Sequence, residues 1–169
     1  MLRPDLTPGS TSVAAAPKLS PKRLYGLLAV AEMVTWALLI ISMVIKYGFG
    51  PEIYVRIFGM VHGVVFIAYG LVTLFVWANE RWSVARGVLG LVSAVVPFAT
   101  LPFERAMLRR GLLSDTWRLA PGGEAPQGPI EKLQATALRS PWLAAAVGLV
   151  AVAAITAALL VIGPPGGTS

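Results

Sequence analysis

The stretch LYGLLAVAEMVTWALLIISMVI, residues 24–45, contains one charged side chain, Glu32. At about 1.5 Å per residue, a helix of this length covers the hydrocarbon core of a bilayer, which is about 30 Å thick. Three cations precede the stretch closely, namely Lys18, Lys22 and Arg23. Because positive charge before a first span favours the cytoplasmic side, the stretch predicts a membrane helix that begins inside the cell.

The composition of the whole chain also indicates a membrane protein. Of its 169 residues, 56% are hydrophobic and 13% are charged, whereas about 25% of the residues of a soluble protein are charged. The mean hydropathy is +0.73. Cysteine is absent, which excludes a disulfide scaffold, a zinc finger and a thiol nucleophile. We therefore expect an all-α, polytopic bundle of transmembrane helices.

Three more apolar stretches follow the first. Residues 53–78 and 142–162 are long enough to cross a bilayer, whereas residues 87–103 reach only the lower limit of length and include Pro97 and Pro102. Each proline removes a backbone donor, so the third helix is expected to kink or to end early. The sequence thus predicts four membrane helices, of which the third is short and kinked by proline.

Polar segments divide the chain into regions. We expect a disordered tail at 1–23, a three-helix membrane core at 24–110, a polar amphipathic or linker segment at 111–140, a fourth membrane helix at 141–163 and a tail at 164–169. The stretch 105–118 mixes apolar residues with arginine, which is typical of a basic amphipathic helix lying on lipid head groups. The side chains expected to contact anionic head groups are Arg105, Arg109, Arg110 and Arg118.

The positive charges leave the orientation open. Four crossings with the N-terminus inside place six Lys and Arg residues inside and eight outside. If the third segment entered and returned on one side, twelve would lie inside and two outside, which agrees with the positive-inside rule. Most short, proline-containing segments are nevertheless kinked crossing helices, so we expect four crossings and keep the re-entrant segment as the alternative. In the crossing arrangement, Arg56 and Glu104 lie near one membrane face and form a rim ion pair.

Two ionisable side chains fall inside the predicted spans, Glu32 in the first and His62 in the second. Because these helices run antiparallel, the helical rise places both side chains at similar depths. Thr35 shares a face with Glu32, and Tyr69 shares a face with His62. We expect a contact between Glu32 and His62, which is either a structural polar pair or part of a proton relay.

Glycines mark candidate positions of close helix packing. Gly59 and Gly63 form a GxxxG motif in the second span, and such a motif lets a neighbouring helix approach closely. Gly87 and Gly90 can serve the same purpose in the third span.

Nothing in the sequence indicates catalysis or a bound cofactor. One histidine, no cysteine and one nearby carboxylate fall short of the three or four ligands of a metal site. No P-loop, nucleophile elbow or dinucleotide fingerprint occurs. The cations flank apolar spans and match no nucleic-acid-binding motif. We expect a protein that is not an enzyme, uses no metal or other cofactor and binds no nucleic acid.

Several of these residues occur in an order that resembles a known family. The matching positions are Glu32, Thr35, Trp36, Lys46-Tyr47, Gly59, His62-Gly63, Phe66, Tyr69, Trp82-Ser83, Pro97-Phe98-Ala99-Thr100 and Phe103-Glu104. The set is similar to the small bacterial integral-membrane family with an HG motif, known as domain of unknown function 3817, over residues 22–110. Ala99 stands where members often have glycine, and the fourth helix lies beyond a family core that usually has three spans.

The resemblance implies a multi-pass protein of the bacterial inner membrane, without a known activity or catalytic residue. Members resemble stand-alone membrane proteins, and similar modules are joined to major-facilitator permeases. This implies a non-enzymatic accessory, regulatory or transport-associated module that assembles with itself or with another membrane protein. The alternative is a minimal proton-coupled transporter that acts as a homo-oligomer, with Glu32 as the titrating group.

Overall fold

The computed structural model describes residues 19–48 and 50–162, and all the regular structure in these ranges is helical. The helices are α1 (Pro21–Gly48), α2 (Ile53–Glu80), α3 (Val84–Val95), α4 (Thr100–Arg109), α5 (Pro129–Arg139) and α6 (Pro141–Ile162). By length and composition, α1, α2 and α6 can cross a membrane, and α3 is a shorter apolar helix. Residues 1–18 of the expected N-terminal tail and the C-terminal tail lie outside the described ranges. The chain is an all-helical membrane protein.

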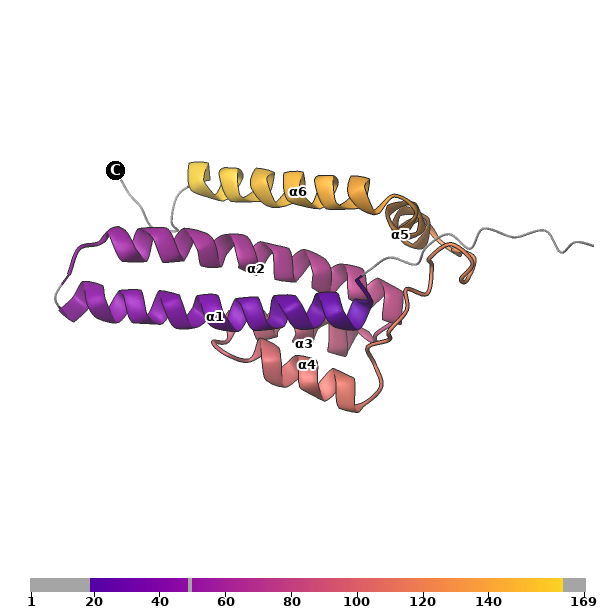
Figure 1. Cartoon of the computed structure of the whole chain (residues 1–169), viewed down its shortest axis with the longest axis horizontal. Helices are drawn as coiled ribbons and strands as arrows, with labels where there is room; N and C mark the ends of the chain where they lie inside the picture. The colour runs from indigo at the N-terminus through magenta and orange to yellow at the C-terminus, as the bar shows by residue number, and fades with distance from the viewer. Residues whose placement is uncertain (1–18, 49, 163–169) are drawn as a thin grey trace, which may run out of the picture.

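Helices α1 and α2 form the central pair and run antiparallel side by side (Figure 1). The buried face of α1 includes Tyr25 and Glu32, which are seven residues apart, and the buried face of α2 includes His62 and Tyr69 with the same spacing. Residues seven apart lie on the same face of a helix. The interface between the two longest helices therefore contains polar side chains at two levels.

The expected third helix is divided into two helices, α3 and α4. Pro97 disfavours helical backbone in the residue before it, and Val96 is accordingly extended, with φ −91° and ψ 119°. Phe98 has a positive φ of 65°. Pro102 lies in the first turn of α4, where a missing backbone N–H is tolerated. The segment is thus broken at Pro97, one of the two prolines from which a kink or an early end was predicted.

Helix α3 extends from the end of α2 towards the middle of the bundle. Near its start, Gly87 lies against the ring of Trp77, and near its end the indole N–H of Trp36 donates to the carbonyl oxygen of Ala94 at 3.0 Å. The 12 residues of α3 span about 18 Å, which is less than the hydrocarbon thickness of about 30 Å. Helix α3 alone is too short to cross.

Helix α4 then returns towards the end of the bundle where α3 begins (Figure 1). The hydroxyl of Thr100, at the start of α4, donates to the carbonyl oxygen of Ala29 at 2.9 Å, and Glu104 lies against Gly26. Thr100 contacts Ala29, and Glu104, further along α4, contacts Gly26, which is nearer the start of α1. The two helices are therefore antiparallel. Together, α3 and α4 form a hairpin of helices against the α1–α2 pair.

The hairpin separates the two residues expected to form the rim ion pair. Glu104 packs near the start of α1, whereas Arg56 lies in the first turn of α2, at the opposite end of the central pair. Arg56 and Glu104 therefore do not meet. The expectation of a rim pair required the third segment to run through to the other end, and its break at Pro97 prevents this.

The expected amphipathic helix over residues 105–118 ends at Arg109. Gly111 follows with a left-handed φ of 66°, which glycine adopts without steric cost. The chain continues without regular structure to α5, and the indole N–H of Trp117 donates to the carbonyl oxygen of Leu19 at 2.6 Å. Because Trp117 is buried inside the protein, this stretch is a packed connection and not a single surface helix.

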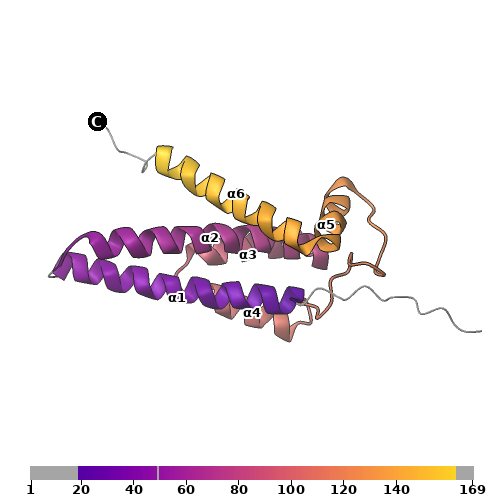
Figure 2. The same cartoon turned by 45° about the horizontal axis from the view of Figure 1, so that its top comes forward.

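Helix α6 has little contact with the rest of the bundle. It contacts α2 and α5, and it diverges from α2 towards its C-terminal end (Figure 2). Val152 is its one buried residue. Most of this apolar helix is therefore available to lipid or to another protein.

Candidate functional site

Glu32, Thr35 and His62 come together between α1 and α2, and we call them the Glu32 centre. Glu32 is fully buried, and Oε2 of Glu32 lies 3.8 Å from Nδ1 of His62. This distance is too long for a hydrogen bond. Among the described residues, neither carboxyl oxygen of Glu32 has a hydrogen-bond partner. The structure thus brings the two ionisable side chains together but leaves the carboxyl group without a hydrogen bond.

Thr35 is the hydrogen-bond partner of the histidine. Its hydroxyl oxygen lies 3.1 Å from Nδ1 of His62 and 3.0 Å from the main-chain oxygen of Glu32. A hydroxyl has one hydrogen, so when Thr35 donates to the carbonyl, Nδ1–H of His62 donates to Thr35. This arrangement places the proton of the neutral imidazole on Nδ1 and leaves Nε2 as the acceptor.

Aromatic rings enclose the imidazole of His62. The centroid of the Trp36 ring lies 4.5 Å from that of His62, and Phe66 lies on another side at 6.2 Å. Trp36 is held in place by its hydrogen bond to Ala94. The end of α3 is therefore connected through Trp36 to the Glu32 centre.

Three hydroxyl groups form a second level of the same interface, and we call them the hydroxyl triad. The hydroxyl oxygens of Tyr25 and Tyr69 are 2.6 Å apart, and that of Tyr69 is 3.0 Å from Oγ of Ser93. All three residues are buried. Sequence reasoning identified Tyr69 but missed Tyr25 and Ser93. The position of Tyr25, seven residues before Glu32, was the signal that could have identified it.

The Glu32 centre contains groups suited to proton chemistry. Among the described residues, no group of three or more His, Cys, Asp or Glu side chains could hold a metal ion. A carboxyl group, an imidazole and hydroxyls all exchange protons. An ionised carboxylate without a partner is costly inside a membrane. The buried, unpaired Glu32 is therefore the chemically most distinctive group of the interface.

The glycines differ in how closely they are approached. A Cβ atom on Gly63 would meet nothing within 4 Å, and one on Gly59 would lie 3.8 Å from Leu39, an ordinary contact. A Cβ on Gly87 would lie 2.1 Å from the ring of Trp77. Among the candidate packing glycines, close approaches therefore occur in α3, at Gly87 and at Gly90, whose Cβ would lie 2.9 Å from Thr73, whereas the GxxxG motif of α2 is not closely approached.

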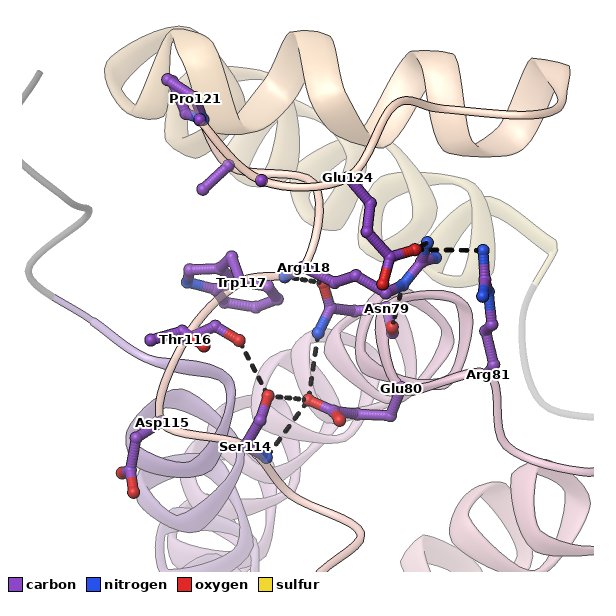
Figure 3. Close-up of a pocket in the computed structure, with 13 residues that line it drawn as sticks. Asn79, Glu80, Arg81, Ser114, Asp115, Thr116, Trp117, Arg118, Pro121 and Glu124 are labelled. Atoms are coloured by element: carbon purple, nitrogen blue, oxygen red, sulfur yellow. Dashed lines mark hydrogen bonds and ion pairs between the residues drawn. The ribbon is translucent and has the colours of Figure 1, made fainter.

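A polar cavity of about 590 Å³ lies where α2 ends, lined by Asn79, Glu80, Arg81 and residues of the connection between α4 and α5 (Figure 3). Its polar groups pair with one another: Oγ of Ser114 donates to Glu80 at 2.6 Å, and Arg81 pairs with Glu124 at 3.3 Å. The region is a polar junction in which these lining side chains bond to one another.

Arg118 closes this junction. Its Nε donates to the carbonyl oxygen of Asn79 at 2.8 Å, and its Nη2 donates to Glu131 of α5 at 2.8 Å. The side chain is 14% exposed, so it caps the C-terminal end of α2 instead of reaching lipid as expected. The backbone N–H of Gln127 and the guanidinium of Arg118 hold the pKa of Glu131 below its ordinary value.

Comparison of the sequence with known proteins shows to which family the chain belongs. A membrane protein of Streptomyces coelicolor, SCO5905, is 39% identical over 93 residues, which are 54% of this chain and 11% of that protein. The uncharacterized membrane protein YdzA of Bacillus subtilis is 36% identical over 70 residues, which are 41% of this chain and 73% of YdzA. No solved structure matches the chain. Residues 22–109, which include α1 to α4 except Pro21, match the model of the family described as a domain of unknown function (DUF3817). Since this match covers more than half of the sequence, the chain belongs to the DUF3817 family of membrane proteins.

Proposed function

We propose that the protein is a non-enzymatic accessory module of the bacterial inner membrane, which regulates or stabilises another membrane protein. The observation that carries this proposal is the exposure of α6, in which Val152 is the one buried residue. Helices associate inside a membrane through close packing of small side chains. Helix α6 is rich in alanine and offers such a surface to a partner.

The relatives support a modular role. The matching region is 11% of SCO5905 but 73% of YdzA. In one relative the module is thus a small part of a longer membrane protein, and in the other it makes up most of a short one. A unit that occurs in both settings fits an accessory part that serves a larger assembly.

A photo-crosslinker tests the proposal in native membranes. A photoreactive residue replaces Leu149 of α6, which is 71% exposed, or Val34 of α1, which is 48% exposed and serves as the control. We expect a specific adduct from position 149 and not from position 34. Two differently tagged copies separate self-association from binding to a different protein. Equal labelling of lipid from both positions, without a protein adduct, would contradict the proposal.

A second candidate function is minimal proton-coupled transport by a homo-oligomer, and the unpaired carboxyl group of Glu32 favours it. A structural pair would place the carboxyl group within hydrogen-bond distance of His62, yet both carboxyl oxygens lack partners. Carboxylates inside membranes commonly mark ion or proton pathways.

The two roles of Glu32 predict different mutant behaviour. In a transporter, Glu32→Gln abolishes proton flux into vesicles that contain a pH-sensitive dye, while the protein stays folded. In a structural pair, Glu32→Gln is tolerated and Glu32→Leu destabilises the protein by about 1–3 kcal/mol. Since Glu32 has no hydrogen-bond partner, we expect Glu32→Leu to fold at least as stably as the wild type. Absence of flux in the wild-type protein would rule out the transport role.

We further propose that the hairpin of α3 and α4 is re-entrant, so that α1, α2 and α6 are the crossing helices. The end of the bundle where α1 begins and α2 ends is called the arginine-rich end. The Lys and Arg residues at or beyond it are Lys22, Arg23, Arg81, Arg86, Arg105, Arg109, Arg110, Arg118, Lys132 and Arg139. Lys46 and Arg56 lie at the other end. The positive-inside rule then supports a cytoplasmic arginine-rich end.

A further inference from the structure

The Glu32 centre and the hydroxyl triad lie along one interface. Tyr25 precedes Glu32 by seven residues on α1, and Tyr69 follows His62 by seven on the antiparallel α2. These offsets separate the two levels by about 10 Å along the bundle. Helix α3 contacts both levels, because Ser93 bonds to Tyr69 and the next residue, Ala94, bonds to Trp36 beside His62.

The hydroxyl triad has the properties of a proton relay. Oγ of Ser93 donates to the carbonyl oxygen of Gly90 at 2.7 Å, so in this arrangement Tyr69 donates to Ser93 and Tyr25 donates to Tyr69. Transfer beyond Ser93 requires its hydroxyl to turn away from Gly90. A hydroxyl that accepts a proton on its oxygen can release its own hydrogen to the next oxygen, so one proton enters for each one that leaves. Burial of all three groups keeps the chain of bonds away from lipid.

The hydroxyl triad lies between the Glu32 centre and the arginine-rich end. The ring of Tyr25 lies 5.7 Å from that of Trp82, which follows α2 and bonds to the main-chain oxygen of Leu112. Glu104 of α4 lies against Gly26, the neighbour of Tyr25 in the sequence. The buried carboxyl group of Glu104 is therefore a polar group beside the triad at that end, where the rings of Tyr25, Trp82 and Phe103 also pack together.

The opposite direction is closed by apolar side chains. On α1, residues 37–45 include one polar residue, Ser42, whose hydroxyl donates to Leu39 of the same helix. The ring of Trp36 covers His62. The titratable groups along this interface are Tyr25 of α1, His62 and Tyr69 of α2, and Glu104 of α4 beside Gly26, whereas Arg56 is exposed near the far end.

We propose that the Glu32 centre exchanges its proton with the arginine-rich end alone, through Ser93, Tyr69 and Tyr25. The proposal requires a water molecule between Glu32 and Ser93, for which the two carboxyl oxygens without a hydrogen-bond partner are acceptors. This inference rests on the second candidate function, in which Glu32 titrates, and it assigns one side of access.

Trp36 provides a built-in reporter for the test. An imidazolium quenches a neighbouring indole, and the Trp36 ring lies 4.5 Å from His62. The protein is reconstituted in vesicles of uniform orientation, selected by the accessibility of a single cysteine from Ala125→Cys. This label is unique because the chain has no cysteine. A rapid pH step is applied on one side, and the Trp36 signal is the difference between wild type and Trp36→Phe.

We expect a fast Trp36 signal when the pH changes at the arginine-rich end and none when it changes at the other end. Tyr69→Phe removes the central hydroxyl and should slow the signal about a hundredfold, the lower range for a positioned proton-transfer group. Ser93→Ala is the second relay variant if Tyr69→Phe does not fold. Tyr47→Phe is the matched control, because Tyr47 is 82% exposed at the far end, and its signal should equal that of the wild type.

Equal responses from both sides, or wild-type kinetics in the relay variants, would overturn the inference. A folded protein without any Trp36 signal would overturn it too. The vesicle flux assay distinguishes failure of the transport function from failure of the proton relay. A one-sided signal without flux removes transport but keeps the inference, whereas flux that is insensitive to Tyr69→Phe keeps transport and removes the relay.

Discussion

Alanine in place of Gly87 tests the closest contact between α3 and α2. A Cβ atom at this position would lie 2.1 Å from the Trp77 ring, whereas carbon atoms in contact are normally about 3.5–4.0 Å apart. The ring must therefore shift by about 1.5 Å or more. A shift of Trp77 would weaken a hydrogen bond, because its indole N–H donates to the carbonyl oxygen of Trp82 at 2.9 Å.

The expected magnitude follows from three contributions. Overpacking typically costs about 1–3 kcal/mol, and a weakened hydrogen bond adds about 1 kcal/mol. Replacing glycine by alanine within a helix returns about 1 kcal/mol. Gly87→Ala should therefore lower the free energy of unfolding by about 1–3 kcal/mol.

Gly63→Ala is the matched control. Its Cβ would meet nothing within 4 Å, so the helix-forming preference of alanine should stabilise the protein by up to about 1 kcal/mol. Both variants are unfolded by titration with a denaturing detergent in mixed micelles, with tryptophan fluorescence as the readout. Equal stability of Gly87→Ala and the wild type would refute the packing argument. Loss of stability in Gly63→Ala would show that the GxxxG motif packs against a second molecule.

The remaining predictions concern topology and the junction at the end of α2. Because the chain has no cysteine, single cysteines can be introduced and labelled with an impermeant thiol reagent. Ser20→Cys and Ala125→Cys should react from the same side of the membrane, and Glu52→Cys should react from the other. Labelling of positions 20 and 125 from opposite sides would show that the third segment crosses. Arg118→Ala removes charge-assisted bonds to the end of α2 and to α5, so it should destabilise the protein by about 1.5–3 kcal/mol and speed hydrogen exchange in α5. The control is Arg110→Ala, at an exposed position, which should change neither the stability nor the exchange. The pKa of Glu131 is lowered from 4.5, first by the N–H of Gln127 and then by Arg118; its stabilising contribution is therefore complete above the ordinary value and is lost as the pH falls below it. Exchange in α5 should accelerate over that acidic range in the wild type, and an identical acid response in Glu131→Gln would contradict this assignment.

Local sequence was sufficient for the class of protein and for most of its elements. Residues 24–45 predict a membrane helix because their length and lack of charge match a bilayer, and α1 contains this stretch. The meeting of Glu32 with His62 was also predictable, since a tight turn makes the first two helices antiparallel neighbours and the helical rise sets the depth of each side chain. Pro97 and Pro102 identified the segment that does not form one helix.

The tertiary structure alone decided the direction after that break and the partners of each polar group. A proline ends a helix, but the path that follows depends on contacts with distant residues, such as Thr100 with Ala29 and Ala94 with Trp36. For the same reason, the sequence could not place Arg118, which it assigned to lipid and which instead caps α2. The period of a helix determines which face a residue occupies, whereas the identity of its neighbour on the next helix arises only from packing. The unpaired state of Glu32 is a consequence of such packing, because His62 bonds to Thr35 on the same helix as Glu32.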